Sequence, residues 1–189
     1  MNRAVLLLIA LLQPAGCGRE LPSAQRSAAE GKRGFAAEGW EVVLCTADEL
    51  GERLTFAGRV LDYEGRPLSK AAVIAYQADH TGLYNPSGSP TRVPRLRGVA
   101  VTDEDGKFRF STIRPGPYPN ASEPAHIHLE VAAPGHRLQY VTYWFEGDPL
   151  ITDERRAKLA TDDETVVVEL SRGSDGIWTF VRDIQLAGN

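Results

Sequence analysis

The chain has 189 residues, of which 42% are hydrophobic and 24% are charged, and its formal net charge is −4. These values are ordinary for a soluble globular protein with one domain of moderate size. The slightly acidic balance gives no electrostatic reason to expect nucleic acid as a partner.

Residues 1–17 have the pattern of an export signal. Arg3 is followed by an apolar run over residues 4–12, and small residues then lead to Cys17. The run is too short to span a bilayer, which takes about 20 residues, and it fits a secretory signal peptide. It also fits a bacterial lipoprotein signal, in which a lipid on Cys17 would be the only membrane attachment. We therefore expect an exported protein that is periplasmic, secreted or anchored by lipid.

The segment after the signal, residues 18–39, is rich in alanine, glycine, serine and charged residues. This composition predicts a flexible tether, and a single compact domain is expected over residues 40–189. The chain has two cysteines, Cys17 and Cys45. They could pair if Cys17 carries no lipid, and otherwise Cys45 is interpreted as a small buried hydrophobe.

The body of the chain is divided by turn signals into segments that favour β-structure. The turn at Asp103–Gly106 lies between two apolar runs, which is a strong hairpin signal. One short helix is expected over residues 153–159, with Thr152 as its N-cap. The expected strands, in chain order, are 56–63, 71–77, 97–102, 107–110, 125–131, 139–145, 165–170 and 177–184.

The last of these segments alternates well, since Trp178, Phe180, Arg182 and Ile184 would share one side of a half-buried strand. Many short strands at similar spacing, with few helical segments, indicate a sandwich. The sequence therefore predicts an all-β fold, a β-sandwich of mainly antiparallel strands with long loops and at most one short helix.

A pair of histidines follows a proline-rich loop. His126 and His128 are two residues apart on an expected strand, so they would project to the same face and could share one metal ion. Tyr118 lies in the loop 115–119, whose prolines fix several φ angles. The histidines could equally be polar residues on a solvated face, and Tyr118 could cover the core. A phenol, with a pKa near 10, binds only a strongly Lewis-acidic ion, so this donor set suits Fe(III) better than zinc.

Six blocks of the sequence resemble the intradiol ring-cleavage dioxygenases, especially short members related to protocatechuate 3,4-dioxygenase. The blocks occur in the family's order within about residues 54–150, and they are 58–68, 73–84, 102–110, 112–119, 124–128 and 145–149.

This resemblance implies a non-haem Fe(III) ion bound by Tyr84, Tyr118, His126 and His128. It also implies a catalytic role for Tyr118, which would leave the iron when a catechol binds and help to take up a substrate proton. The implied reaction is intradiol cleavage of a small catechol-like aromatic by O2 to a muconate-type diacid.

Two positions depart from the family pattern. Glu123 stands three residues before the first histidine, where the family commonly has arginine, and Thr142 stands where it often has glutamine. A reversed charge beside an anionic transition state could cost several kcal/mol of stabilisation. Compensation would need another cation near the site, and the candidates are Arg92, Arg95 and Arg97.

Two other interpretations remain open at this level. Segments 58–77 and 99–110 also resemble carboxypeptidase-regulatory-like and transthyretin-like domains, which suggests a non-catalytic β-sandwich that binds a partner or has a structural role. Those domains do not need two tyrosines together with the histidine pair. Alternatively, zinc or copper could bind the two histidines with one further residue, chosen from Glu130, Glu146 and His136.

Overall fold

The structure is a computed structural model, and it describes residues 39–162 and 164–188. The predicted signal over residues 1–17, with Cys17, lies outside the described residues, as does the predicted tether apart from Gly39. Within the described part, no helix has the length and apolar character needed to cross a membrane.

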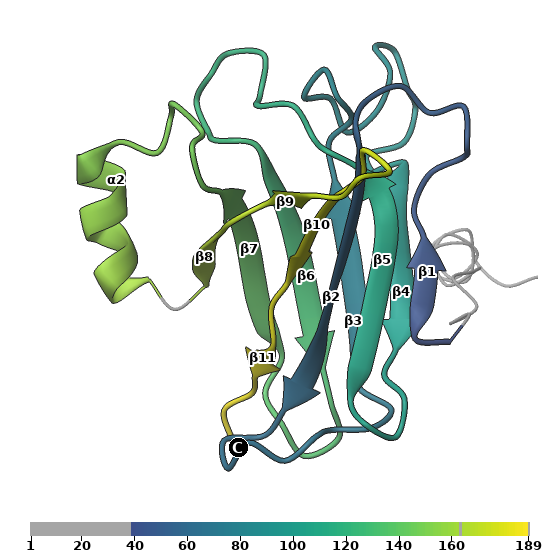
Figure 1. The fold of residues 1–189 in the computed structure, drawn as a ribbon, viewed down its shortest axis with the longest axis vertical. Helices are drawn as coiled ribbons and strands as arrows, with labels where there is room; N and C mark the ends of the chain where they lie inside the picture. The colour runs from purple at the N-terminus through teal and green to yellow at the C-terminus, as the bar shows by residue number, and fades with distance from the viewer. Residues whose placement is uncertain (1–38, 163, 189) are drawn as a thin grey trace, which may run out of the picture. The chain divides into compact units, whose positions relative to one another are not determined.

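Two β-sheets stack face to face, as Figure 1 shows. The first sheet has the order β1-β5-β2-β10-β9, with β11 also paired to β2, and the second has the order β4-β3-β6-β7-β8. The strands of the first sheet are β1 (Glu41–Val43), β2 (Arg53–Leu61), β5 (Lys107–Ile113), β9 (Ser171–Arg172), β10 (Trp178–Val181) and β11 (Ile184–Gln185). Those of the second are β3 (Ala72–Gln77), β4 (Leu96–Val101), β6 (His126–Ala132), β7 (Gln139–Phe145) and β8 (Thr165–Val168).

The core lies between the sheets and is rich in aromatic rings. Phe56 on β2 stacks on Phe110 and Phe180, with ring centroids 5.2 and 5.3 Å apart, and Tyr143 of the opposite sheet meets it edge-on at 6.3 Å. Alternating side chains along each strand place one set of residues in this core and leave the other set on the outer face. The outer face of the second sheet therefore remains available for polar residues.

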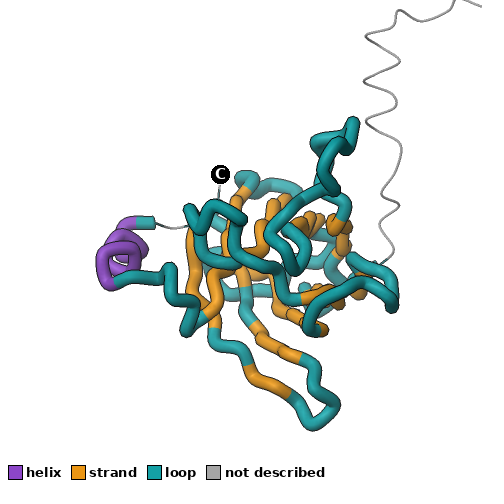
Figure 2. The backbone as a smooth tube through the Cα atoms, turned by 90° about the horizontal axis from the view of Figure 1, so that it is seen from above, coloured by secondary structure: helices purple, strands orange, loops and turns teal. Residues whose placement is uncertain are grey.

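The predicted fold class is confirmed: the structure is a β-sandwich with one short α-helix in its described part. Both sheets are mixed, because β1, β8, β10 and β11 pair in parallel with their neighbours. Helix α2 (Asp153–Lys158) begins after Thr152, whose Oγ1 accepts a hydrogen bond from the Arg155 amide at 3.3 Å. Figure 2 shows α2 to one side of the strands.

Three expectations about local structure were wrong. The strand expected over 177–184 is two strands, because Arg182 and Asp183 interrupt it, and Arg182 is exposed instead of sharing a face with Phe180. The short strands β1 and β9 were not predicted. Cys45 is only half-buried, and its Sγ accepts a hydrogen bond from Arg53 Nη1 at 3.4 Å.

Candidate metal centre

The four predicted ligands come from one strand and two loops. His126 and His128 lie on β6, where Ile127 and Leu129 point into the core, so both histidines project from the outer face of the second sheet. Tyr84 lies in the loop after β3, and Tyr118 lies in the loop after β5. Because both strands run to the upper end of the sandwich in Figure 1, these loops meet beside the start of β6.

The side chains of these four residues converge. The phenol oxygens of Tyr84 and Tyr118 are 2.9 Å apart, and the Tyr84 oxygen is 3.4 Å from His126 Nε2. The ring of His126 lies with its centroid 5.0 Å from that of Tyr118 and 4.6 Å from that of His128. The structure thus brings together two phenol oxygens and two imidazoles from three separate segments of the chain.

Hydrogen bonds orient both imidazole rings toward this cluster. His126 Nδ1 lies 2.7 Å from the Pro124 carbonyl oxygen, which can only accept, so Nδ1 carries the proton and Nε2 presents its lone pair to the phenols. His128 Nδ1 lies 3.1 Å from Thr142 Oγ1, which leaves its Nε2 available to a ligand. Such partners on the remote nitrogen are typical of metal-binding histidines.

The protonation states also suit a metal of high charge. Burial, with a smaller contribution from His126, lowers the pKa of His128 to about 4, so this imidazole is neutral at pH 7. Burial and the hydrogen bond with Tyr118 raise the pKa of Tyr84, so it is a neutral phenol without a metal. Ionising such a phenol takes a strongly Lewis-acidic cation. The donor set therefore fits Fe(III), which prefers hard oxygen donors together with imidazole.

A charged network shapes the loop that carries Tyr84. The Asp79 carboxylate accepts hydrogen bonds from the amides of Thr81 and Leu83 at 2.8 and 3.2 Å. Arg95 contacts Asp79 at 3.2 Å and Glu49 at 2.6 Å, and its own amide donates to the Tyr84 carbonyl at 3.1 Å. One buried carboxylate thus fixes the turn before Tyr84, while its arginine partner holds Tyr84 itself.

A second carboxylate sets the start of β6. Asp148 Oδ2 accepts a hydrogen bond from the Ala125 amide at 2.9 Å, directly before His126, and Oδ1 accepts one from the Leu150 amide at 2.9 Å. The segment after β7 is thereby joined to the strand that carries the histidines. This contact gives a structural reason for the Phe145–Pro149 block seen in the sequence.

A small cavity of about 210 Å³ opens beside the cluster. Pockets for drug-sized molecules run from about 300 to 1,000 Å³, so this cavity suits a smaller molecule. It is lined by Tyr118, Glu123, His126, His128, Thr142, Trp144 and Thr165. Tyr118 is therefore the phenol that lines the cavity, whereas Tyr84 is not part of the lining.

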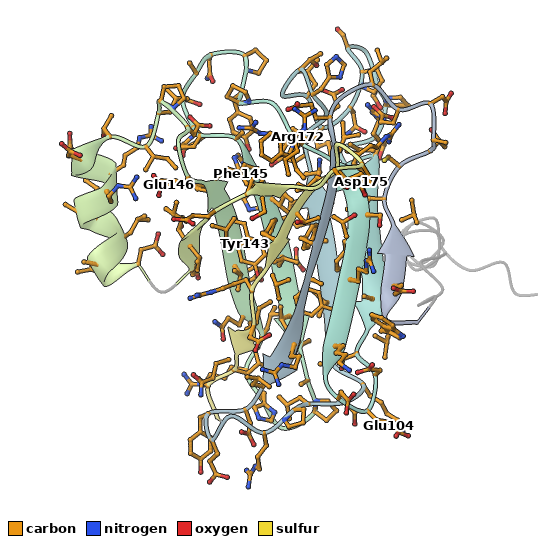
Figure 3. All side chains as sticks on the ribbon, viewed as in Figure 1. Glu104, Tyr143, Phe145, Glu146, Arg172 and Asp175 are labelled. Carbon is orange, nitrogen blue, oxygen red and sulfur yellow. The ribbon has the colours of Figure 1, made fainter. Side chains whose placement is uncertain are left out.

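The structure does not support the zinc or copper site. Among the described residues, no three of the histidine, cysteine, aspartate and glutamate side chains lie close enough to hold a metal ion. Glu146 lies beyond the end of β7, as Figure 3 shows, and its carboxylate pairs with Arg156 at 2.8 Å. His136 Nδ1 lies 3.0 Å from the Pro134 carbonyl, in the connection between β6 and β7.

The cation that meets Glu123 is one that the sequence reasoning missed. Arg155 Nη1 lies 3.2 Å from the Glu123 carboxylate, whereas Arg95, one of the suggested candidates, binds Glu49 and Asp79. The contact between Thr142 and His128 was also missed. The cross-strand register could have predicted this contact, since the two residues are directly opposite each other on β6 and β7.

Comparison with known proteins gives one consistent result. A family model described as "Dioxygenase" matches residues 33–183. The chain is 35% identical over 127 residues to chlorocatechol 1,2-dioxygenase of Rhodococcus opacus, covering 57% of this chain and 49% of the relative. It is 37% identical over 115 residues to the protocatechuate 3,4-dioxygenase beta chain of Burkholderia cepacia, covering 55% and 49%. The chain spans about half the length of the curated relatives it matches.

Solved structures agree with the sequence matches. The dioxygenase domain of a dioxygenase carbohydrate-binding protein fusion from Streptomyces sp. SirexAA-E matches with a TM-score of 0.60 and 26% identity, covering 84% of this chain and 96% of that one. Catechol 1,2-dioxygenase from Pseudomonas arvilla C-1 matches with a TM-score of 0.65 and 25% identity, covering 87% and 66%. These findings support the enzyme interpretation over a non-catalytic β-sandwich module. The chain belongs to the intradiol ring-cleavage dioxygenase family.

Proposed function

We propose that this protein is a non-haem Fe(III) intradiol dioxygenase that cleaves a small catechol with O2. The observation that carries the proposal is the convergence of Tyr84, Tyr118, His126 and His128 beside a small cavity. These four residues would hold the metal. Fe(III), when bound, supplies the Lewis acidity that ionises phenols and catechols. It also activates the bound catecholate for reaction with O2.

The proposed reaction consumes one catechol and one O2. The bond between the two hydroxyl-bearing ring carbons breaks, and both oxygen atoms enter the product, which is a muconate-type diacid. O2 is reduced and the aromatic ring is oxidised, so no further reductant is needed.

The protein's own residues would position the reactants and handle protons. Tyr118 lines the cavity, so its phenol oxygen lies where a substrate hydroxyl would enter, and once ionised it would accept the proton of that hydroxyl. Tyr84 does not line the cavity, so it would hold the metal without meeting the substrate. The two histidines are held by Pro124 and Thr142, which limits rotation of the rings.

The test is oxygen consumption by purified, iron-loaded protein with a panel of catechols. We expect uptake of one O2 per catechol and incorporation of both atoms of labelled oxygen into a ring-opened diacid, detected by mass spectrometry. A coloured, iron-containing protein that consumes no oxygen with any catechol would contradict the activity and leave the metal site standing.

We also propose that the protein is exported, on the strength of the basic start and apolar run before Cys17. The mass of the mature N-terminus, compared between the native chain and the Cys17→Ser variant, separates lipid attachment from simple secretion. An unprocessed N-terminus beginning at Met1 would contradict export.

A further inference from the structure

Glu123 places a carboxylate at the rim of the cavity. It lies in the loop between Tyr118 and His126, and its side chain is 46% exposed. Among the residues that line the cavity, the others are tyrosine, histidine, threonine and tryptophan. Glu123 therefore supplies the only Asp, Glu, Lys or Arg side chain in this lining.

Arg155 holds this carboxylate from outside the cavity. Its Nη1 lies 3.2 Å from Glu123 Oε2, and its Nη2 donates to the Ser122 carbonyl at 2.7 Å. Its guanidinium also lies over the ring of Trp144, 5.8 Å from the centroid. One side chain of helix α2 thus contacts two consecutive residues of the loop and one wall of the cavity.

This arrangement decides which charge a bound ring would meet. Arg155 is not among the residues that line the cavity, so Glu123 is the member of this ion pair that lines it. The arginine weakens the carboxylate's field without cancelling it, because the pair is partly exposed and its two charges lie at different distances from the ligand. A ligand with its own carboxylate would face a like charge.

We propose that Glu123, positioned by Arg155, makes this site select uncharged and cationic catechols over carboxylated ones. The proposal rests on the proposed function, and it names the substrate class of the same site. Glu123 would act as a specificity-determining residue by disfavouring the wrong ligand, which is one general route to selectivity. Arg155 would act as a positioning residue that keeps the loop against the cavity.

Binding can be measured separately from turnover by titrating iron-loaded protein with catechols in the absence of oxygen. The visible absorption band reports ligand binding to the metal. Three probes of similar size carry different charges: 4-methylcatechol is neutral, protocatechuate carries a carboxylate, and dopamine carries an ammonium group. We expect protocatechuate to bind about tenfold or more weakly than 4-methylcatechol, with a gap that narrows at high salt.

Variants then assign this selectivity to the carboxylate. Glu123→Gln should reduce the difference in affinity between 4-methylcatechol and protocatechuate to about threefold or less. Glu146→Gln, which removes an exposed carboxylate outside the cavity, should leave this difference unchanged. The double variant Glu123→Arg with Arg155→Glu keeps a pair and reverses the charge that faces the ligand, so it should favour protocatechuate. Thermal unfolding checks that each variant is folded.

The outcomes separate the two proposals. Equal affinity for protocatechuate and 4-methylcatechol in the native protein, or an unchanged gap in a folded Glu123→Gln variant, would overturn the selectivity. Selective binding without oxygen uptake would support the selectivity and contradict the dioxygenase activity. Failure of all three probes to bind iron-loaded protein would overturn both.

Discussion

The amide of Gly116 donates a hydrogen bond to the carbonyl oxygen of Asp79 at 2.9 Å, and this bond joins the two loops that carry the tyrosines. Asp79 begins the loop of Tyr84, and Gly116 lies two residues before Tyr118. The loops approach so closely that a Cβ at Gly82 would lie 2.0 Å from the Pro117 carbonyl oxygen. The separation of the two phenols therefore depends on main-chain contacts outside the candidate metal centre.

Gly82→Ala should disrupt the candidate metal centre without changing any of the four proposed ligands. The added methyl group cannot fit against Pro117, and the φ of +83° at Gly82 is unfavourable for alanine, so the loop of Tyr84 must move. We expect a loss of about 1–3 kcal/mol of stability and a clear fall in bound iron, measured by thermal unfolding and metal analysis. Gly88→Ala is the matched control, because Gly88 has a φ of +81° and open space around its Cα. Equal iron loss in both variants would refute the close-approach argument.

The two tyrosines should differ when each is changed to phenylalanine. Tyr84→Phe removes the phenol that does not line the cavity, and we expect loss of most of the visible colour and at least about tenfold weaker iron binding. Tyr118→Phe removes the phenol that lines the cavity. It should therefore retain more iron than Tyr84→Phe, but its turnover rate per bound iron should fall further. Tyr140→Phe, at a 47% exposed residue of β7, is the control. Unchanged iron content in Tyr84→Phe would show that this phenol is not a ligand.

Much of the sandwich could be predicted because period-two alternation is a local property of the chain. The strand expected over 139–145 matches β7, and the helix begins after the expected cap at Thr152. The two-residue strand β9 and the three-residue β1 carry too few alternating residues to be recognised, and they exist because another strand lies beside them. Similarly, the interruption between β10 and β11 at Arg182 becomes evident only from the pairing of both strands with β2.

The candidate site also has one part that could be predicted from the sequence and another part that could not. The motifs that resemble the family predicted all four proposed ligands, because these four residues lie within those motifs. Their supports depend on contacts across the fold: Thr142 reaches His128 through strand register, and Arg155 reaches Glu123 over 32 residues. Such partners become visible only when the loops and the helix have been placed.

Thr142→Val should weaken iron binding through His128. Valine has nearly the same shape as threonine and removes the hydroxyl that lies 3.1 Å from His128 Nδ1. Loss of such a partner typically costs 10- to 100-fold in metal affinity, and a chelator competition assay can measure it. Thr165→Val also changes the cavity lining, but it leaves the histidine contact intact and should have a smaller effect. An equal loss in both variants would indicate a general change in the cavity.

Acid should destabilise the native protein more than its Asp79→Asn variant. Burial raises the pKa of Asp79, but hydrogen bonds from Thr81, Leu83 and Arg95 outweigh it, so the pKa in the folded protein lies below its ordinary 3.8. A lowered pKa means that the ionised carboxylate stabilises the fold above pH 3.8, and that this contribution is lost as the pH falls through the folded-state value.

Thermal or denaturant unfolding between neutral pH and about pH 3 measures this contribution. At pH 7 we expect Asp79→Asn to be less stable by about 2 kcal/mol, the typical worth of hydrogen bonds to a charged group, and the difference from the native protein should shrink on acidification. Asp105→Asn is the control, because Asp105 is an exposed carboxylate whose pKa is lowered by Lys107 at the surface, where ion pairs contribute little. A difference for Asp79→Asn that stays constant down to pH 3 would show that hydrogen-bond geometry, and not the charge of Asp79, holds the Tyr84 loop in place.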